Sequence, residues 1–256
     1  MATALRCLTI LAAIILAALV ITPTLHAATG PRSAADVTLL NATNRDRAAA
    51  GLPPLQWDAN LAAAAHQHAL LMAQRNALSH QFPGEPPVQD RARHAGARFS
   101  LIAENVAEGP SIPGLHTQWM NSAPHRANLM DRELNAVGIS VVQSGNMYFA
   151  VEDFSTAVAS SSIEEQEQQV VSQLTARGLR DVATTADARR TCELDRGYSG
   201  QRPSTVMRYE TADLRQLPDD INRRLTVGEV HSAAIGACEA TAASDFTRYR
   251  IAILLY

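Results

Sequence analysis

The spacing of apolar residues changes its period at residue 136, and this change constrains the fold more than any other feature of the sequence. Apolar and polar residues alternate over Ala136–Val142 and again over Met147–Phe154, as they do in half-buried strands. Between them lies Gln143–Asn146, with Ser144 and Gly145 at its centre, which is typical of a hairpin turn. The segments before residue 136 follow a helical period, so we expect a mixed α+β domain with helices first and an antiparallel hairpin last.

Capping residues delimit the expected helices. Ser33 and Asp36 have the spacing of a capping box, and Asp58 is a favourable N-cap for a second helix. We expect helices over residues 33–50, 59–77, 89–95, 115–122 and 126–130. His68 lies on the apolar stripe of the second helix, so we expect it to be a buried, hydrogen-bonded core residue.

Residues 81–113 form the longest stretch without a sustained period. This stretch is rich in Pro, Gly and charged residues, which predicts a long connection around one short helix. Glu104 lies inside it, where binding loops are often found, although a solvated loop has the same composition.

The second half of the chain predicts another small α+β domain. A polar linker, residues 156–162, separates it from the first domain, residues 33–155. Within residues 163–256 we expect helices over Ile163–Arg177 and Pro218–Leu225, and strands over Thr205–Tyr209, Val230–Ala237 and Tyr249–Tyr256. The type of this domain is not evident from the sequence.

The N-terminal segment is predicted to be an export signal. An apolar run, Cys7–Ile21, follows Arg6 and is about 15 residues long, shorter than the ~20 needed to span a bilayer. Residues 1–28 are therefore predicted to be a signal peptide cleaved near Ala27 or Ala28, with an uncleaved N-terminal anchor as the alternative. We expect a secreted or periplasmic protein of the cell envelope with no stable membrane span after cleavage.

Signal cleavage would leave two cysteines, Cys192 and Cys238. A pair of cysteines in an oxidising compartment predicts one disulfide, and two unpaired buried thiols are the alternative. With 46 residues between them, the bond would stabilise the folded state by about 4 kcal/mol on the loop-entropy argument.

The charge of the chain excludes one class of partner. The formal net charge is -3 and the sequence pI is about 6.2. Because nucleic-acid binding requires a basic surface, we expect no nucleic-acid partner.

Several short motifs, in one order, resemble a known family. They are Gly51-Leu52-Pro53-Pro54-Leu55 with Trp57-Asp58, Leu78-Ser79-His80, Glu104-Asn105-Val106, Trp119-Met120-Asn121, His125-Arg126-Ala127-Asn128 and Val137-Gly138-Ile139. This order is similar to that of the bacterial branch of the CAP superfamily, which comprises cysteine-rich secretory proteins, antigen 5 and pathogenesis-related proteins. The resemblance covers residues 39–154 and implies a three-layer α-β-α sandwich, followed here by the small α+β domain.

The resemblance also implies a ligand site. In that family two histidines and two acidic residues line a central cavity, and His80, Glu104 and His125 stand at three of those positions. The second acidic position, just after Trp119, holds Met120. Asp131 and Glu133 lie nearby in the sequence as alternative carboxylates. Imidazole and carboxylate groups are zinc ligands, so His80 and His125 are the candidate ligands for zinc or another divalent cation.

Three functions are compatible with these features. The first is an exported binding module whose polar cavity holds a divalent cation or small ligand and which engages an unknown protein, lipid or small molecule. The second is a structural or adhesion protein of the cell envelope. The third is a metal-assisted hydrolase with Glu104 as general base. Because no Gly-x-Ser-x-Gly elbow supplies a nucleophile, we assign no catalytic residue and favour a non-enzymatic role.

Overall fold

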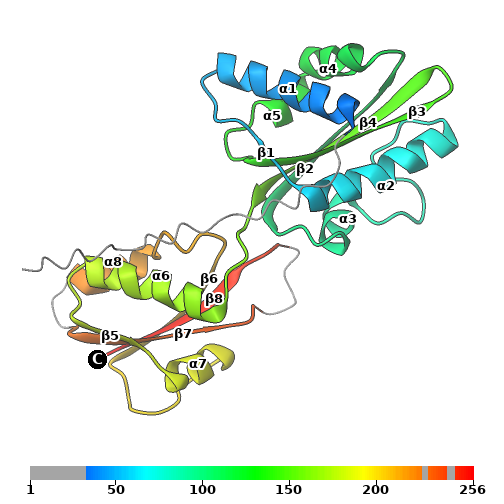
Figure 1. Ribbon diagram of the computed structural model, residues 1–256. Coiled ribbons are helices and arrows are strands. Elements are labelled where there is room, and N and C mark those ends of the chain that lie inside the picture. The colour runs from blue at the N-terminus through cyan, green and yellow to red at the C-terminus, as the bar shows by residue number, and fades with distance from the viewer. Residues whose placement is uncertain (1–32, 227–229, 241–245) are drawn as a thin grey trace, which may run out of the picture.

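The computed structural model describes residues 33–226, 230–240 and 246–256. It contains two four-stranded mixed sheets, each with its own helices (Figure 1). The predicted signal peptide, residues 1–28, lies outside the described residues. Across the described ranges, none of the helices is long and apolar enough to cross a bilayer.

The first sheet has the strand order β1-β3-β4-β2. In chain order its elements are α1 (Ala34–Ala49), β1 (Gln56–Trp57), α2 (Ala59–Arg75), α3 (Val88–His94), β2 (Phe99–Gly109), α4 (Ile112–Asn121), α5 (Ala123–Leu129), β3 (Ala136–Ser144) and β4 (Met147–Ala157). β1 runs parallel to β3, and the pairs β3–β4 and β4–β2 are antiparallel. The predicted hairpin is therefore confirmed, and its second strand lies at the centre of the sheet.

Helices cover both faces of this sheet, which confirms the three-layer sandwich (Figure 1). α1, α4 and α5 pack on one face, where Leu39, Trp119 and Phe154 are buried in one cluster. α2 and α3 cover the other face, where Met72 and Phe149 are buried. The alternation along β4 sends successive side chains to opposite faces.

A glycine sets how closely α2 approaches the sheet. A Cβ added to Gly138 on β3 would lie 2.0 Å from the backbone nitrogen of Ala62, in the first turns of α2. Only glycine permits this approach of helix backbone to strand backbone. The contact fixes α2, and the loop that follows it, against the sheet.

The predicted connection over residues 81–113 is wrong, because it contains the eleven-residue strand β2. β2 is an edge strand, and side chains from the neighbouring helices cover its outer carbonyl groups. Trp119 Nε1 donates to the carbonyl of Val106 at 3.0 Å, and Gln118 Nε2 donates to that of Glu108 at 3.2 Å. Because both sides of the strand are partly covered, its residues show no polar and apolar alternation.

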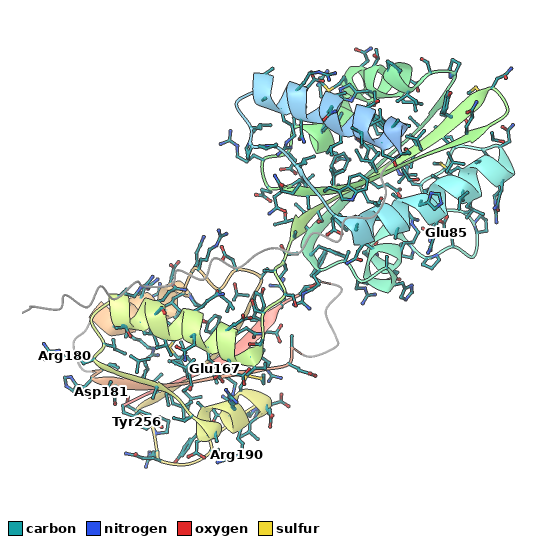
Figure 2. All side chains as sticks on the ribbon, in the orientation of Figure 1. Glu85, Glu167, Arg180, Asp181, Arg190 and Tyr256 are labelled. Atoms are coloured by element: carbon teal, nitrogen blue, oxygen red, sulfur yellow. A yellow bond between two sulfur atoms is a disulfide. The ribbon has the colours of Figure 1, made fainter. Side chains whose placement is uncertain are left out.

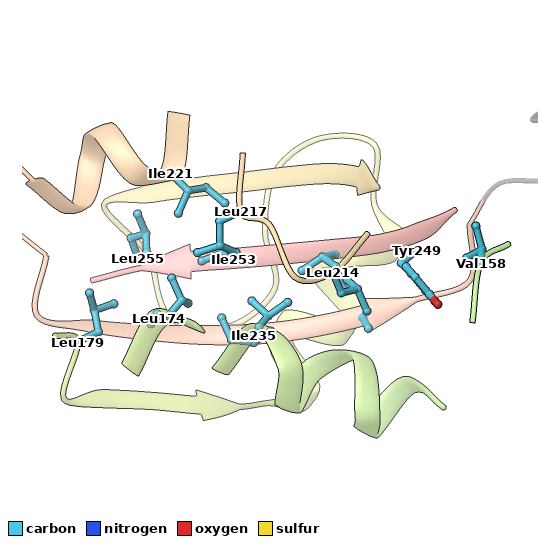
Figure 3. Close-up of a cluster of buried hydrophobic side chains, with 14 residues drawn as sticks. Val158, Leu174, Leu179, Leu214, Leu217, Ile221, Ile235, Tyr249, Ile253 and Leu255 are labelled. Atoms are coloured by element: carbon cyan, nitrogen blue, oxygen red, sulfur yellow. The ribbon is translucent and has the colours of Figure 1, made fainter. Parts of the chain in front are cut away.

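The second sheet has the order β5-β7-β8-β6. Its elements are α6 (Ile163–Ala176), β5 (Asp181–Thr184), α7 (Ala186–Glu193), β6 (Thr205–Thr211), α8 (Asp219–Thr226), β7 (Ser232–Cys238) and β8 (Tyr249–Leu255). α6 and α8 pack on one face around Leu174, Ile221 and Ile253, as Figure 3 shows. The sequence pattern finds α6, α8, β6, β7 and β8 but not β5 or α7.

A disulfide joins α7 to the other face of this sheet. Cys192 on α7 is bonded to Cys238 on β7, with the two Cα atoms 5.8 Å apart. The predicted Cys192–Cys238 bond is confirmed.

Among the described residues, Thr247 forms two hydrogen bonds with Phe99 that join the two halves of the chain, beside the ring contact of Phe99 with Phe246. The amide nitrogen of Thr247 donates to the carbonyl of Phe99 at 2.8 Å, and the amide of Phe99 donates to the Thr247 hydroxyl at 3.2 Å. β4 ends at Ala157 and α6 begins at Ile163, so these contacts supplement one short covalent connection. The domain limits 33–155 and 163–256 stay a prediction.

Candidate functional site

Glu104, at the middle of the edge strand β2, is the centre of a polar cluster. Its side chain is 5% exposed, and both carboxylate oxygens are engaged. Oε1 lies 2.8 Å from Nδ1 of His80, and Oε2 accepts a hydrogen bond from Arg91 on α3. The structure thus brings two of the three predicted site residues into direct contact, with Arg91 as a third partner.

Arg91 fixes the loop that carries His80. Its guanidinium donates to the backbone carbonyls of His80 and Pro86, each at 3.2 Å, in addition to Glu104. The side chain is only 4% exposed, so these charge-assisted hydrogen bonds are shielded from water. Arg91 belongs to the short helix that the sequence predicts at 89–95, but its role is not evident from the sequence.

Glu85 anchors the other end of the same loop. Its carboxylate lies 2.6 Å from Nδ1 of His68 on α2 and accepts a hydrogen bond from the amide of Phe82 at 2.9 Å. Figure 2 shows Glu85 beside α2. His68 is fully buried and its Nε2 contacts the carbonyl of Ser79 at 2.7 Å, which confirms the predicted core histidine.

His80 presents one free edge of its ring to solvent. Its side chain is 59% exposed, so this part of the site is open to solvent. The hydrogen bond to Glu104 raises the pKa of His80, against the opposing effect of burial. Because a carboxylate only accepts hydrogen bonds, Nδ1 carries a proton, and in the neutral ring Nε2 keeps its lone pair.

His125, the third predicted residue, faces His80 from α5. The two ring centroids are 6.4 Å apart with the rings 27° from parallel. Burial lowers the pKa of His125, and the neighbouring His80 lowers it further. His125 is therefore the imidazole of the pair that stays neutral to lower pH.

Two asparagines hold α5 against β2. Asn105 Nδ2 donates to the carbonyl of His125 at 3.1 Å and its Oδ1 accepts from Asn128 at 2.9 Å. Asn128 also donates to the carbonyl of Glu104 at 3.3 Å. Both asparagines occur in the quoted motifs, and this network explains why an asparagine follows Glu104 and another lies in α5.

A second carboxyl group, which the sequence reasoning missed, lies beside Glu104. Asp153 on β4 is directly opposite Glu104 in the strand register and is fully buried. Burial, followed by the Glu104 carboxylate, raises the pKa of Asp153 well above its usual value. The signal was available, because two charged residues interrupt an apolar strand at 152 and 153. Asp131 and Glu133 instead lie in the turn after α5, where Asp131 accepts from the amide of Glu133.

The neighbouring Glu152 points to the opposite face of the sheet. It is fully buried, and its Oε1 accepts from the hydroxyl of Thr43 on α1 at 3.3 Å. Burial raises the pKa of Glu152 to about 8. At neutral pH this side chain is therefore a carboxylic acid.

The donor set of the site is two imidazoles. Both oxygens of Glu104 are taken by His80 and Arg91, so this carboxylate orients an imidazole and does not add a ligand. Within the described part of the chain, no group of three or more His, Cys, Asp and Glu side chains is placed to hold a metal ion. A cation at His80 and His125 would complete its coordination with solvent or a bound ligand.

A depression of about 360 Å³ lies beside the same cluster. Residues of α2 and α3 line it together with Glu85 and Arg91.

Comparisons with known proteins place these observations in a family. Residues 40–156 match the family model described as CAP, the Cysteine-rich secretory protein family. The protein YkwD of Bacillus subtilis, described as uncharacterized, is 31% identical over 117 residues, which are 45% of this chain and 46% of YkwD. The chain therefore spans less than half of that relative.

Solved structures with the same region are also similar. An extracellular protein of Bacillus anthracis containing an SCP domain shares 28% identity, with a TM-score of 0.44, over 50% of this chain and 45% of that one. An outer surface protein of Borrelia burgdorferi shares 19% identity, with a TM-score of 0.46, over 50% of this chain and 96% of that one.

Proposed function

Starting from the fact that residues 40–156 form a CAP domain, we propose that the protein is an exported binding module whose His80–His125 pair takes a divalent cation or a small polar ligand. The observation that carries the proposal is the fixed, solvent-facing imidazole of His80, whose Nδ1 is held by the buried Glu104. A carboxylate behind an imidazole sets its tautomer and strengthens the outer nitrogen as a ligand.

The disulfide supports export. Structural disulfides persist in oxidising compartments and are rare in the cytosol. The Cys192–Cys238 bond therefore fits a mature protein outside the cytoplasm.

The geometry near His80 favours binding over hydrolysis. Ser79, the hydroxyl closest in sequence, donates to the backbone carbonyl of Gln81 at 2.8 Å. A nucleophilic serine instead needs its hydroxyl on a base such as histidine. Glu104, the candidate general base, is held by Arg91 and His80.

Calorimetric titration of zinc into the mature protein tests the proposal. We expect binding in the parent protein and its loss in both His80→Ala and His125→Ala. Glu104→Gln keeps both imidazoles but weakens their orientation, so affinity should fall by about 10- to 100-fold. His94→Ala, which removes an exposed imidazole on α3, is the matched control and should bind like the parent.

Two results would contradict the metal-binding proposal. One is the absence of binding heat together with an unchanged melting temperature in the parent protein. The other is an equal loss of affinity in His94→Ala, which would indicate dispersed surface histidines. Either result would favour the structural role, in which the cluster only holds the loop in place.

A further inference from the structure

The two sheets have the same topology. In each, the first strand in chain order is outermost and runs parallel to the third, as β1 does with β3 and β5 does with β7. The third and fourth strands form an antiparallel hairpin, and the fourth strand also pairs antiparallel with the second. The two sheets therefore have the same strand order, β1-β3-β4-β2 in the first and β5-β7-β8-β6 in the second.

The helices enter at equivalent points in the chain. α1 and α6 precede the first strand, α2 and α7 join the first strand to the second, and α4–α5 and α8 join the second to the third. Their faces also agree, because α6 and α8 share one hydrophobic cluster on the face opposite α7. α1, α4 and α5 likewise share a cluster on the face opposite α2.

A tight glycine occurs at the same place in both sheets. A Cβ on Gly236 of β7 would lie 2.1 Å from the backbone of Ala188 and Arg189 in α7, as a Cβ on Gly138 would meet α2. In each sheet, the residue before the glycine accepts from the N-cap of that helix. Asp58 donates to Val137 at 2.9 Å, and Thr185 donates to Ile235 at 3.2 Å.

The end of the first helix matches as well. Gly51 follows α1 with φ of 71°, and Gly178 follows α6 with φ of 97°. A leucine follows each glycine, and Gly51 precedes the cap Asp58 by as many residues as Gly178 precedes the cap Thr185. The register from helix end to next helix start is therefore identical in the two halves.

We infer that residues 162–255 are a second, shortened copy of the fold of residues 33–157, and that this copy kept the scaffold but not the acidic site. The assignment gives a type to the domain whose type the sequence does not reveal. It goes beyond the proposed function, because it concerns the half of the chain outside the CAP match.

The site positions changed their chemistry in the second copy. In the first sheet, Gly138 on β3 is paired with Asp153 on β4, and Asp153 is paired in turn with Glu104 on β2. In the second sheet, Gly236 on β7 is paired with Ala252 on β8, and Ala252 is paired in turn with Arg208 on β6. The guanidinium of Arg208 donates to backbone carbonyls at the end of α7 and just after it, that of Thr191 at 2.8 Å among them. An arginine and an alanine thus replace the two carboxyl groups.

The disulfide occupies a helix-to-strand contact of the shared fold. α7 has 8 residues where α2 has 17, so less helix surface packs on the second sheet. Counting from the caps and from the glycines, Cys192 corresponds to Ala65 of α2 and Cys238 to Ser140 of β3. Ser140 faces α2, since its hydroxyl lies 2.9 Å from Nδ1 of His66. The disulfide therefore attaches the short helix α7 covalently to strand β7.

This correspondence is tested by moving the disulfide. In the full chain, the double substitution Ala65→Cys with Ser140→Cys should form a second disulfide under mild oxidation, counted as two alkylatable thiols fewer than in the same variant before oxidation, with the Cys192–Cys238 bond intact in both samples. Ala69→Cys with Ser140→Cys is the matched control, because Ala69 is an equally buried alanine one helical turn further on. The control should keep both thiols free.

Failure to oxidise at 65 and 140, or equal oxidation of the control, would overturn the inference. If the double variant does not fold, Gly138→Ala and Gly236→Ala give an independent measurement. Each should lower the melting temperature of its own half, because each new methyl group meets helix backbone. A Gly236→Ala protein with the melting behaviour of the parent would equally overturn the equivalence.

Discussion

Glu152 offers the sharpest test of the electrostatics of the CAP domain. The side chain is fully buried on β4, and burial raises its pKa to about 8. Glutamine has nearly the same shape and its oxygen can accept from Thr43, the present partner. Glu152→Gln therefore removes the titration while keeping the packing.

The size of the effect follows from linkage between proton binding and folding. The folded-state pKa lies above the unfolded value of 4.5, so Glu152 favours the folded state at low pH and this contribution is lost as pH rises toward about 8. The slope is about 1.4 kcal/mol per pH unit in that window. At pH 7 folding must take up a proton at a cost of about 3 kcal/mol, which the glutamine variant avoids.

Urea unfolding at pH 5 and pH 7 measures this difference in one domain. Both tryptophans of the chain, Trp57 and Trp119, belong to the CAP domain, so tryptophan fluorescence reports the unfolding of that domain alone. We expect the free energy of unfolding of Glu152→Gln, relative to the parent, to increase by about 2.5 kcal/mol between the two pH values. A change in packing caused by the substitution alters the free energy of unfolding equally at both pH values, so it cancels in the difference between them.

A parallel pH dependence in the two proteins would refute the reasoning. It would mean that Glu152 is ionised in the folded state, with water or a cation reaching it. Asp153 does not contribute to the difference between the two proteins, because it points to the other face of the sheet and is present in both.

Three further outcomes are expected. Arg47 is fully buried and donates to four backbone carbonyls, so Arg47→Met should cost about 3 kcal/mol or more in the same fluorescence assay, while Arg45→Met on the exposed side of α1 should be neutral. Replacing Cys192 and Cys238 by Ser should destabilise the second domain by about 4 kcal/mol, seen by circular dichroism, and leave the fluorescence transition unchanged. Because the pKa of His80 is raised, zinc affinity should still be increasing with pH above the ordinary value of about 6.5; a pH-independent affinity would exclude this imidazole as a ligand.

The sequence predicted correctly those helix starts and turns that depend on residues close to one another in the chain. The capping box of Ser33 and Asp36 is present in the structure, and the side chain of Asp58 accepts from the first amides of α2. The hairpin around Gly145 follows from alternation on two strands. These features depend on neighbouring residues in the sequence, so the sequence alone specifies them.

The convergence of the site depends on contacts that the sequence does not encode locally. His80, Glu104 and His125 meet because three different elements pack at one sheet edge, and only the family resemblance anticipated this. The roles of Arg91 and Asp153 as partners of Glu104 were not predicted for the same reason. Their contacts with Glu104 join residues from α3 and from a neighbouring strand.

The second copy is hidden for a related physical reason. The shared features are a strand order, two tight glycines and a helix end, and many side chains satisfy the same backbone arrangement. In the sequence, a single glycine at position 236 does not predict a close contact with a helix backbone. Its equivalence to Gly138 is visible only when the backbone of α7 lies against it.

The placement of the last strand at the centre of each sheet sets an order of events during synthesis. β4 pairs with both β3 and β2, so the first sheet can close only when residue 157 has been made, and β8 imposes the same requirement on the second. At about 5 to 20 residues per second, residues 158–256 need about 5 to 20 s. Until β8 has been made, strands β6 and β7 lack their common partner, and the hydrogen bonds between Thr247 and Phe99 cannot form before residue 247 is made.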